Sequence, residues 1–323
     1  MKLLVLLAAW GAASAQLFAT MGGGKFGTLS PKTGAFSSIE GQEYLAQGQQ
    51  LSALNEKDGT YYILGWNEVK SVAELVGWAL PDGKLQPPVT LPFNESVFVG
   101  VGQTLGWYSQ DNYMIVGGRV GGQAPKGNHA LGFVDPQTGH FDPLLELEGY
   151  LIPVLGGNGV YDSGSEMMLQ LFGIPLTKGT AAIAYACFDM TKQGEPTLMM
   201  DDVLLGRDIS AIASDPVSGL VYGVGCGMGE DGCVTILMTL DPRNQTFTNV
   251  AALDNWAGSL GSMSAIDAAS RIFYWVSQKA ANSSPTAPFY LVGTDMDTGA
   301  TVSSPQVCSN STNCLWSMEF YNA

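Results

Sequence analysis

Acidic and aromatic side chains alternate in the glycine-rich segments that separate the β-rich stretches of this sequence. Carboxylates beside aromatic rings suit a surface that binds a small molecule, a glycan or another protein, because rings supply apolar area and carboxylates supply directed contacts. We expect such binding to involve residues from several of these segments, namely Tyr44, Trp66, Glu95, Tyr150, Asp201, Asp202, Asp254 and Trp256.

Bases that work at neutral pH are scarce, because the chain has only two histidines, His129 and His140. His140 lies in a turn sequence, TGHF, where solvation is expected. His129 begins a β-rich stretch, HALGF, and is therefore the better candidate for a catalytic base. A nucleophile elbow of the type GxSxG is missing, since Gly258–Ser264 (GSLGSMS) does not fit it.

The first fifteen residues, MKLLVLLAAWGAASA, have the composition of a secretory signal peptide: a lysine, a short apolar core and a small-residue cleavage site. Residues 16–323 then form the mature chain, which we expect to be one domain and a monomer. Four glycosylation triplets fit a secreted chain, at Asn94, Asn244, Asn282 and Asn310. The sequence therefore predicts a secreted, extracellular glycoprotein.

The charge of the mature chain excludes several kinds of partner. Removing the signal peptide takes away one of the 14 basic residues and none of the 29 acidic ones, so the net charge is 13 − 29 = −16. A nucleic acid or an anionic membrane surface needs a basic footprint, which is absent. After the signal peptide no run approaches the roughly 20 apolar residues that cross a bilayer, so no membrane span is expected.

Four of the five cysteines form two local pairs, Cys226 with Cys233 and Cys308 with Cys314. Both pairs lie in loop-like sequence, where disulfides form in an oxidising compartment. Cys187 is left over in the apolar run AAIAYACF, and we expect it to be a buried thiol.

Two kinds of β-hairpin alternate along the chain with a common period of about 53 residues. The first kind includes Ser264–Val276 (SAIDAASRIFYWV), with turns near Gly59, Asn112, Gly164, Gly219 and Ser270. The second kind has turns near Gly34, Gly83, Gly139, Gly194, Gln245 and Gly299. Two successive hairpins make a four-stranded antiparallel unit, and radial repetition of such units predicts an all-β propeller.

The count of units is six, with one unit shared by the two ends of the chain. The C-terminal segment CLWSMEFYNA resembles a first strand, with Ser317–Phe320 aligned to Ser264–Asp267, and the N-terminal QLFATMG resembles a second strand. Pairing them closes the ring and removes two exposed sheet edges. Stacking of one blade on the next would supply the core, and the aromatic run Phe273–Val276 is expected to pack between blades.

On these repeats the chain resembles the six-bladed β-propeller superfold, and is loosely similar to YWTD, NHL and gluconolactonase-like propellers. The resemblance implies that loops entering each first strand, together with loops joining the two hairpins, surround one mouth of the central channel. We call this surface the loop face, and the opposite surface, made of hairpin turns, the turn face. Turns such as DPQTG and DPVSG have ordinary turn chemistry and are expected to be structural.

The same resemblance implies a place for a metal. Polar residues at or near the openings of first strands stand where lactonase-type propellers hold calcium, namely Gln50, Gln103, Asn158 and Asp208. Calcium takes six to eight oxygen ligands, which several blades together could supply. The alternative is that these side chains cap strands and contact channel water.

Three functions remain open at this level. The first is binding of a ligand, protein or glycan through the loop face. The second is a calcium-dependent hydrolase or lactonase with His129 as base. The third is a structural component of an extracellular matrix.

Overall fold

The computed structural model describes residues 15–44, 47–67, 69–92, 104–108, 111–120, 128–147, 152–153, 159–175, 181–190, 196–199, 209–229, 232–284, 286–309 and 314–321. Within these ranges the regular elements are β-strands. The exceptions are Met190, which has 3-10 conformation, and a short 3-10 helix, Ala280–Asn282.

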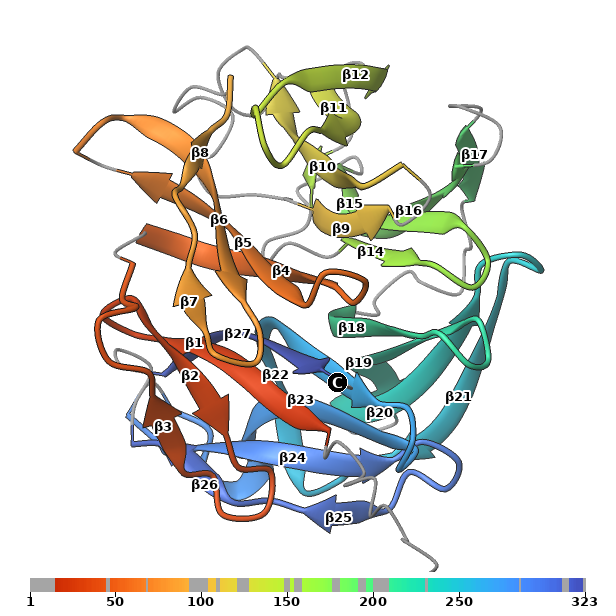
Figure 1. Ribbon diagram of the computed structural model, residues 1–323. Helices are drawn as coiled ribbons and strands as arrows, with labels where there is room; N and C mark the ends of the chain where they lie inside the picture. Colours follow the sequence, from red (N-terminus) through yellow and green to blue (C-terminus); the bar gives the residue numbers. More distant parts are fainter. Residues whose placement is uncertain are drawn as a thin grey trace, which may run out of the picture.

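Six small antiparallel sheets stand around a common centre, so the predicted six-bladed propeller is confirmed (Figure 1). Blade 1 contains β4 (Gln47–Asn55), β5 (Thr60–Asn67), β6 (Val72–Ala79), β7 (Lys84–Leu85) and β8 (Val89–Thr90). Blade 2 contains β9 (Thr104–Tyr108), β10 (Tyr113–Val120), β11 (Asn128–Val134) and β12 (Phe141–Leu147). Blade 3 contains β13 (Ile152–Pro153), β14 (Gly159–Asp162), β15 (Met167–Pro175), β16 (Ala181–Asp189) and β17 (Pro196–Met199).

The second half of the chain continues the ring. Blade 4 contains β18 (Ile209–Asp215), β19 (Leu220–Gly229), β20 (Gly232–Asp241) and β21 (Thr246–Ala252). Blade 5 contains β22 (Trp256–Asp267), β23 (Ile272–Lys279), β24 (Phe289–Asp295), β25 (Thr301–Ser303) and β26 (Gln306–Cys308). Blade 6 contains β27 (Leu315–Tyr321) and then β1 (Gln16–Met21), β2 (Lys25–Leu29) and β3 (Phe36–Ser38).

The ring closes through strands from the two ends of the chain, as the sequence predicts. β27 pairs with β1 along its length, with Phe18 opposite Glu319 and Thr20 opposite Ser317 (Figure 1). The Cys308–Cys314 disulfide, with a Cα–Cα distance of 5.2 Å, links the end of β26 to the segment just before β27. The closing strand is therefore covalently tied to blade 5.

The two cysteines of the second predicted disulfide lie on the neighbouring strands β19 and β20. Cys226 is opposite Thr235 and Cys233 is opposite Met228, but the side chains of both cysteines lie outside the described residues. Cys187 is fully buried and unpaired, and burial raises the pKa of its thiol to about 12, as expected for an inert core cysteine.

The predicted alignment of the closing strand is wrong by one residue. In three blades an alanine of the first strand is opposite a tyrosine of the second, the pairs being Ala53–Tyr62, Ala213–Tyr222 and Ala265–Tyr274. In blade 6 the corresponding pair is Glu319 opposite Phe18. Glu319 therefore takes the place of Ala265, not of Ile266, and a one-residue shift moves a side chain to the other face of its strand.

The core is divided among the interfaces between blades. Apolar residues of the described chain form six clusters, and neighbouring residues of one strand alternate between them. On β23, Phe273 and Trp275 face blade 4, while Tyr274 and Val276 face blade 6. The predicted packing of this aromatic run between blades is confirmed, and it follows from the period of two along a strand.

Left-handed residues end the hairpins at the predicted places. Gly34 and Gly299 have φ of 71° and 72°. A Cβ on Gly34 would lie 2.4 Å from Gln306 O, and a Cβ on Gly299 would lie 2.1 Å from Ala251 Cβ. In two hairpins of the first kind the left-handed residue follows the predicted turn centre. It is Glu166 where Gly164 was predicted, and Arg271 where Ser270 was predicted. These turns place the ends of the strands on the turn face.

Aspartates open the turns as structural residues. Asp135 accepts the backbone N–H of Gln137 at 2.8 Å, and that bond, with one from Thr138, holds the pKa of Asp135 below its ordinary value. Asp215 accepts the N–H of Val217 in the same way. The DPQTG and DPVSG turns therefore have the hydrogen bonds of ordinary aspartate turns.

Candidate functional site

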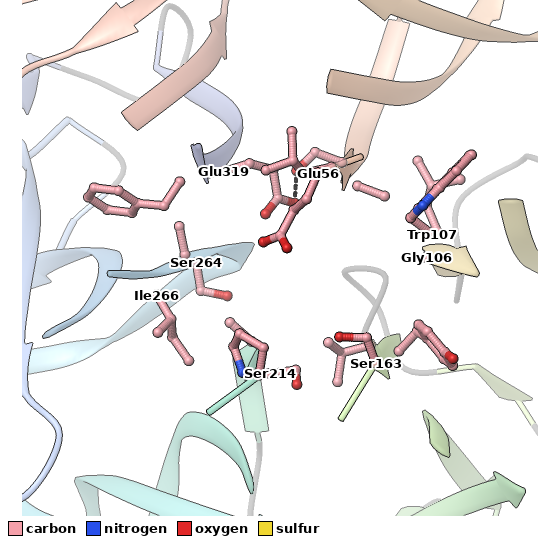
Figure 2. Close-up of a pocket in the computed structure, with 18 of the residues that line it drawn as sticks. Glu56, Gly106, Trp107, Ser163, Ser214, Ser264, Ile266 and Glu319 are labelled. Carbon is pink, nitrogen blue, oxygen red and sulfur yellow. Dashed lines mark hydrogen bonds between the residues drawn. The ribbon is translucent and has the colours of Figure 1, made fainter. Parts of the chain in front are cut away.

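A cavity of about 540 Å³ lies at the centre of the ring, on the axis of the propeller (Figure 2). The innermost strand of every blade contributes to its wall, namely β4, β9, β14, β18, β22 and β27. Residues of the turns that follow these strands also line it, including Glu56, Ser163, Pro216 and Ala268. The cavity therefore reaches the turn face, whereas the sequence predicts a site at the loop face.

Glu319 is the acidic residue that the closing strand brings to this wall. Its carboxylate accepts a hydrogen bond of 2.8 Å from Ser52 Oγ on blade 1, across the interface where the ring closes. Burial, together with the nearby charge of Glu56, raises the pKa of Glu319 to about 7. This carboxyl group is therefore close to half protonated at neutral pH.

A second carboxylate lies beside the first. Glu56 belongs to the turn after β4, is exposed to solvent, and points into the cavity next to Glu319 (Figure 2). Lys57 also lines the cavity, but its Nζ lies 3.5 Å from Asn112 Oδ1 on the turn of blade 2. The ammonium group of Lys57 therefore has a neutral partner on the neighbouring blade.

The serine hydroxyls of the wall give their protons to the protein. Ser52 donates to Glu319, and Ser264 Oγ donates to the carbonyl of Ile212 at 2.8 Å. Ser214 donates to the buried carboxylate of Asp162 on the neighbouring blade. Since a hydroxyl has one proton and two lone pairs, the oxygens of Ser52 and Ser214 can still accept a hydrogen bond.

A buried polar network supports the closing strand behind Glu319. Ser317 Oγ lies 2.7 Å from Thr20 Oγ1 and 2.7 Å from Tyr61 Oη, and all three residues are almost fully buried. Burial and the charge of Glu319 raise the pKa of Tyr61, so the phenol stays protonated. These bonds fix β27 against blade 1 and so fix the position of Glu319.

The raised pKa of Glu319 predicts a pH-dependent stability. Between about pH 4.5 and pH 7 the unfolded carboxyl is ionised while the folded one keeps its proton, so folding stability falls as pH rises through that window. Glu319→Gln removes this titration. The change that it causes in the free energy of unfolding should therefore be more stabilising at pH 8 than at pH 4, by roughly 1–2 kcal/mol. Urea unfolding at both pH values measures this, and the exposed Glu40→Gln is the control. Equal effects of Glu319→Gln at both pH values would contradict the prediction.

The predicted binding residues do not form one group in the described chain. Trp256 is 6 % exposed and packs against Trp275 and Tyr290, so it belongs to the interface between blades and not to an open surface. Tyr44 is half-buried and donates its hydroxyl to the buried Glu74, so it ties the loop before β4 to blade 1. Trp66 is half-buried against the core of blades 1 and 2, and Asp254 is exposed.

The remaining predicted site residues are described only in part. Gln50 lies on β4. His129 lies on β11, between Arg119 of β10 and Leu147 of β12. The side chains of Gln50 and His129 lie outside the described part. Four binding and three metal positions lie wholly outside it, namely Glu95, Tyr150, Asp201, Asp202, Gln103, Asn158 and Asp208. Calcium binding and a role of His129 therefore stay predictions.

Of the glycosylation triplets, the one at Asn244 lies on an exposed turn of blade 4, where Asn244 Nδ2 donates to Asp241 at 2.6 Å. Asn282 lies in the 3-10 helix, with its side chain outside the described residues. Asn94 and Asn310 lie wholly outside the described ranges.

Sequence reasoning missed Glu319 and Glu56, because it assigned function to the loops and treated strands and turns as structural. One signal could have found Glu319. First strands carry small or apolar residues at its position, with Ala53, Ala213 and Ala265 in three blades. A carboxylate there is the exception within the repeat, and the one-residue error in alignment hid it.

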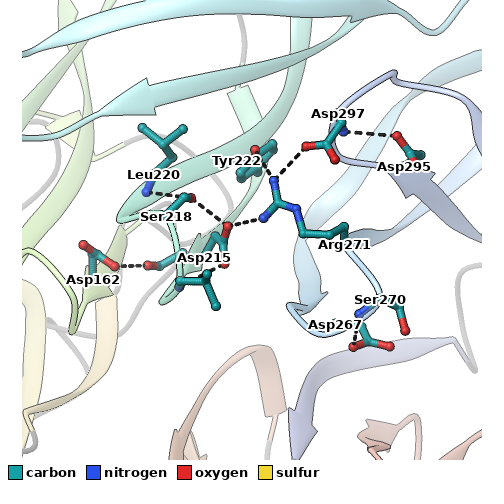
Figure 3. A network of polar contacts seen from close by, with 12 residues as sticks. Asp162, Asp215, Ser218, Leu220, Tyr222, Asp267, Ser270, Arg271, Asp295 and Asp297 are labelled. Carbon is teal, nitrogen blue, oxygen red and sulfur yellow. Dashed lines mark hydrogen bonds and ion pairs between the residues drawn. The ribbon is translucent and has the colours of Figure 1, made fainter.

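A separate group of charges on the turn face has a structural role. Arg271 Nη1 lies 2.5 Å from Asp215 Oδ2, and Nη2 lies 2.9 Å from Asp297 Oδ1 (Figure 3). Asp215 is fully buried and also accepts from Ser218. This network, which we call the Arg271 clasp, joins blade 5 to blade 4. The carboxylate of Asp215 is fully buried within it and is not open to a ligand.

Within the described ranges no group of three His, Cys, Asp or Glu side chains could hold a metal ion. A helix long and apolar enough to cross a membrane is likewise absent from that part of the chain.

Comparisons with known proteins agree with this fold and identify no family. No protein-family model matches the sequence, and no curated protein sequence matches it. TolB from Acinetobacter baumannii is similar in structure, with a TM-score of 0.59 and 8% identity over 96% of this chain and 67% of that one. The hydrazine synthase of Kuenenia stuttgartiensis has a TM-score of 0.58 and 9% identity over 97% of this chain and 47% of that one. Because the sequence identities are this low, the structural similarity shows only that the chain has the β-propeller fold. It leaves the activity open.

Proposed function

We propose that this chain is a secreted, N-glycosylated propeller that binds a small organic ligand in its central cavity. The observation that carries the proposal is the cavity itself, because it gathers side chains from all six innermost strands. Its volume of about 540 Å³ lies within the roughly 300–1,000 Å³ typical of ligand pockets.

The mixed chemistry of the wall supports a ligand. Apolar side chains such as Leu105, Ile212 and Ile266 line the cavity together with the serine hydroxyls and the carboxylates of Glu56 and Glu319. Pockets that bind organic molecules combine apolar area with a few directed polar groups in this way. The signal peptide, the four glycosylation triplets and the disulfide support an extracellular location.

A hydrolase is the second candidate, and Glu319 is the observation that favours it. A carboxyl group with a pKa near 7 beside a carboxylate is the arrangement that a general acid and its partner need. In this case Glu319 would donate a proton to a leaving group and Glu56 would act as base. A screen of glycosides and lactones with wild type and Glu319→Gln tests it, and activity that survives the substitution would exclude Glu319 as the acid.

Narrowing the cavity mouth should abolish ligand binding. Ala268 lines the cavity in the turn after β22, and an indole ring in its place would fill the opening. Ala268→Trp should weaken any ligand found for the wild type by at least roughly tenfold, since steric exclusion removes most contacts. The measurement is a thermal-shift screen of small molecules followed by calorimetry of each ligand found.

Ala269→Trp is the matched control, because Ala269 is exposed on the same turn and does not line the cavity. It should bind like the wild type. Equal binding by Ala268→Trp and Ala269→Trp would show that the ligand sits elsewhere and would contradict the proposed function.

A further inference from the structure

The hydrogen-bond directions in the cavity wall limit the kind of ligand that fits. Ser52 and Ser214 each donate to a carboxyl oxygen within the protein, so they offer lone pairs, not protons, to a guest. Glu56 adds a carboxylate, which accepts only. The wall is therefore rich in acceptors and suits a guest that donates hydrogen bonds.

The charge of the wall points in the same direction. Glu319 and Glu56 lie side by side in the cavity (Figure 2). The one lysine of the described wall, Lys57, has its Nζ 3.5 Å from Asn112 Oδ1 on the turn of blade 2. An anionic guest would meet two carboxylates and only one lysine in the described wall. A single positive charge on the guest would offset their repulsion.

One buried donor in another part of the described wall lacks a partner. Trp107 lines the cavity, is 9 % exposed, and its Nε1 has no hydrogen-bond partner among the described residues. Figure 2 shows Trp107 across the cavity from Glu319. A planar apolar body on the guest would match the aliphatic side chains of the wall, such as Leu105 and Ile266.

From this arrangement we infer that the cavity binds a small organic ammonium ion, with its nitrogen between Glu319 and Glu56. The inference rests on the proposed function and adds the class of ligand. A bare metal ion fits less well, because the cavity is many times larger than an ion and a large part of its wall is apolar.

Binding of a cation should expel the proton of Glu319. The groups that face this carboxyl are Glu56, Tyr61 and Ser52, with Lys57 at the cavity rim. Because an ammonium ion favours the ionised carboxylate, affinity should rise by about tenfold from pH 6 to pH 8, and close to half a proton should be released at pH 7.

Three isosteric probes test the class of ligand by titration calorimetry at pH 6 and pH 8: tyramine, its alcohol analogue tyrosol, and 4-hydroxyphenylacetate. We expect tyramine to bind at least tenfold more tightly than tyrosol at pH 8, with the acid weakest. The enthalpy of tyramine binding at pH 7 should differ between phosphate and Tris buffers, because the released proton is taken up by the buffer. Glu319→Gln should remove this difference and the pH dependence, and it should weaken tyramine binding more than tyrosol binding.

The possible results separate the two proposals. Equal affinity for tyramine and tyrosol, or tighter binding of the acid, would overturn the ammonium inference and leave the proposed function standing. Failure of all three probes overturns the inference; the proposed function fails with it only if the small-molecule screen also finds no ligand that Ala268→Trp excludes. A melting temperature raised by calcium alone, with no effect of tyramine, would replace the ammonium ion with a metal.

Discussion

Trp78→Ala should lower the free energy of unfolding by about 3–5 kcal/mol, the largest effect of any single substitution considered for this chain. Trp78 lies on β6, is fully buried, and stacks on Phe26 of blade 6 with the ring centroids 4.6 Å apart. Its Nε1 also donates to the carbonyl of Gln42 at 2.9 Å. Truncation leaves a cavity at the interface between blades 6 and 1 and an unpaired carbonyl, and both destabilise.

Two further variants separate these causes. Trp78→Phe keeps a ring against Phe26 and loses the indole donor, so we expect a loss of about 1–2 kcal/mol. Trp66→Ala removes a half-buried tryptophan of the same blade and should cost less than Trp78→Ala. Urea unfolding measures all three. If Trp66→Ala is as destabilising as Trp78→Ala, the interface that closes the ring has no special weight in the stability.

Arg271→Met should lower the free energy of unfolding by about 2–4 kcal/mol. The substitution keeps much of the side-chain volume but removes the cation of the Arg271 clasp, so the carboxylate of Asp215 remains buried without its charge partner. Removing one member of a buried pair leaves the desolvation cost of the other uncompensated. The hydrogen bonds that Asp215 accepts from Val217 and Ser218 remain and limit the loss.

The double substitution Arg271→Met with Asp215→Asn tests this cause. Asparagine can still accept the N–H of Val217, and it carries no charge, so the double variant should be more stable than Arg271→Met alone. Arg243→Met is the matched control: this exposed turn arginine donates to the carbonyl of Gly164 on blade 3 at 2.7 Å, and among the described residues it pairs with no buried acid. A loss for Arg243→Met as large as for Arg271→Met would show that packing, and not charge, is responsible.

The sequence by itself determined the architecture of this protein. The period of about 53 residues, the alternation along strands such as Phe273–Val276, and the glycines at turns are local features that repeat six times. They predict the blades, the interfaces between them and the shared closing blade, because side-chain direction in a strand depends only on its period of two. The Cys308–Cys314 bond was predictable for the same reason, since its partners are near neighbours in the chain.

Only the tertiary structure decided which side chains meet at the centre. Glu319 and Glu56 are 263 positions apart in the sequence, and they come together only when β27 closes the ring against blade 1. Tertiary packing also moved Trp256 from the expected surface into the core and tied Tyr44 to Glu74. Burial and the neighbouring charge of Glu56 raise the pKa of Glu319, and both depend on contacts between distant parts of the chain, which no local pattern contains.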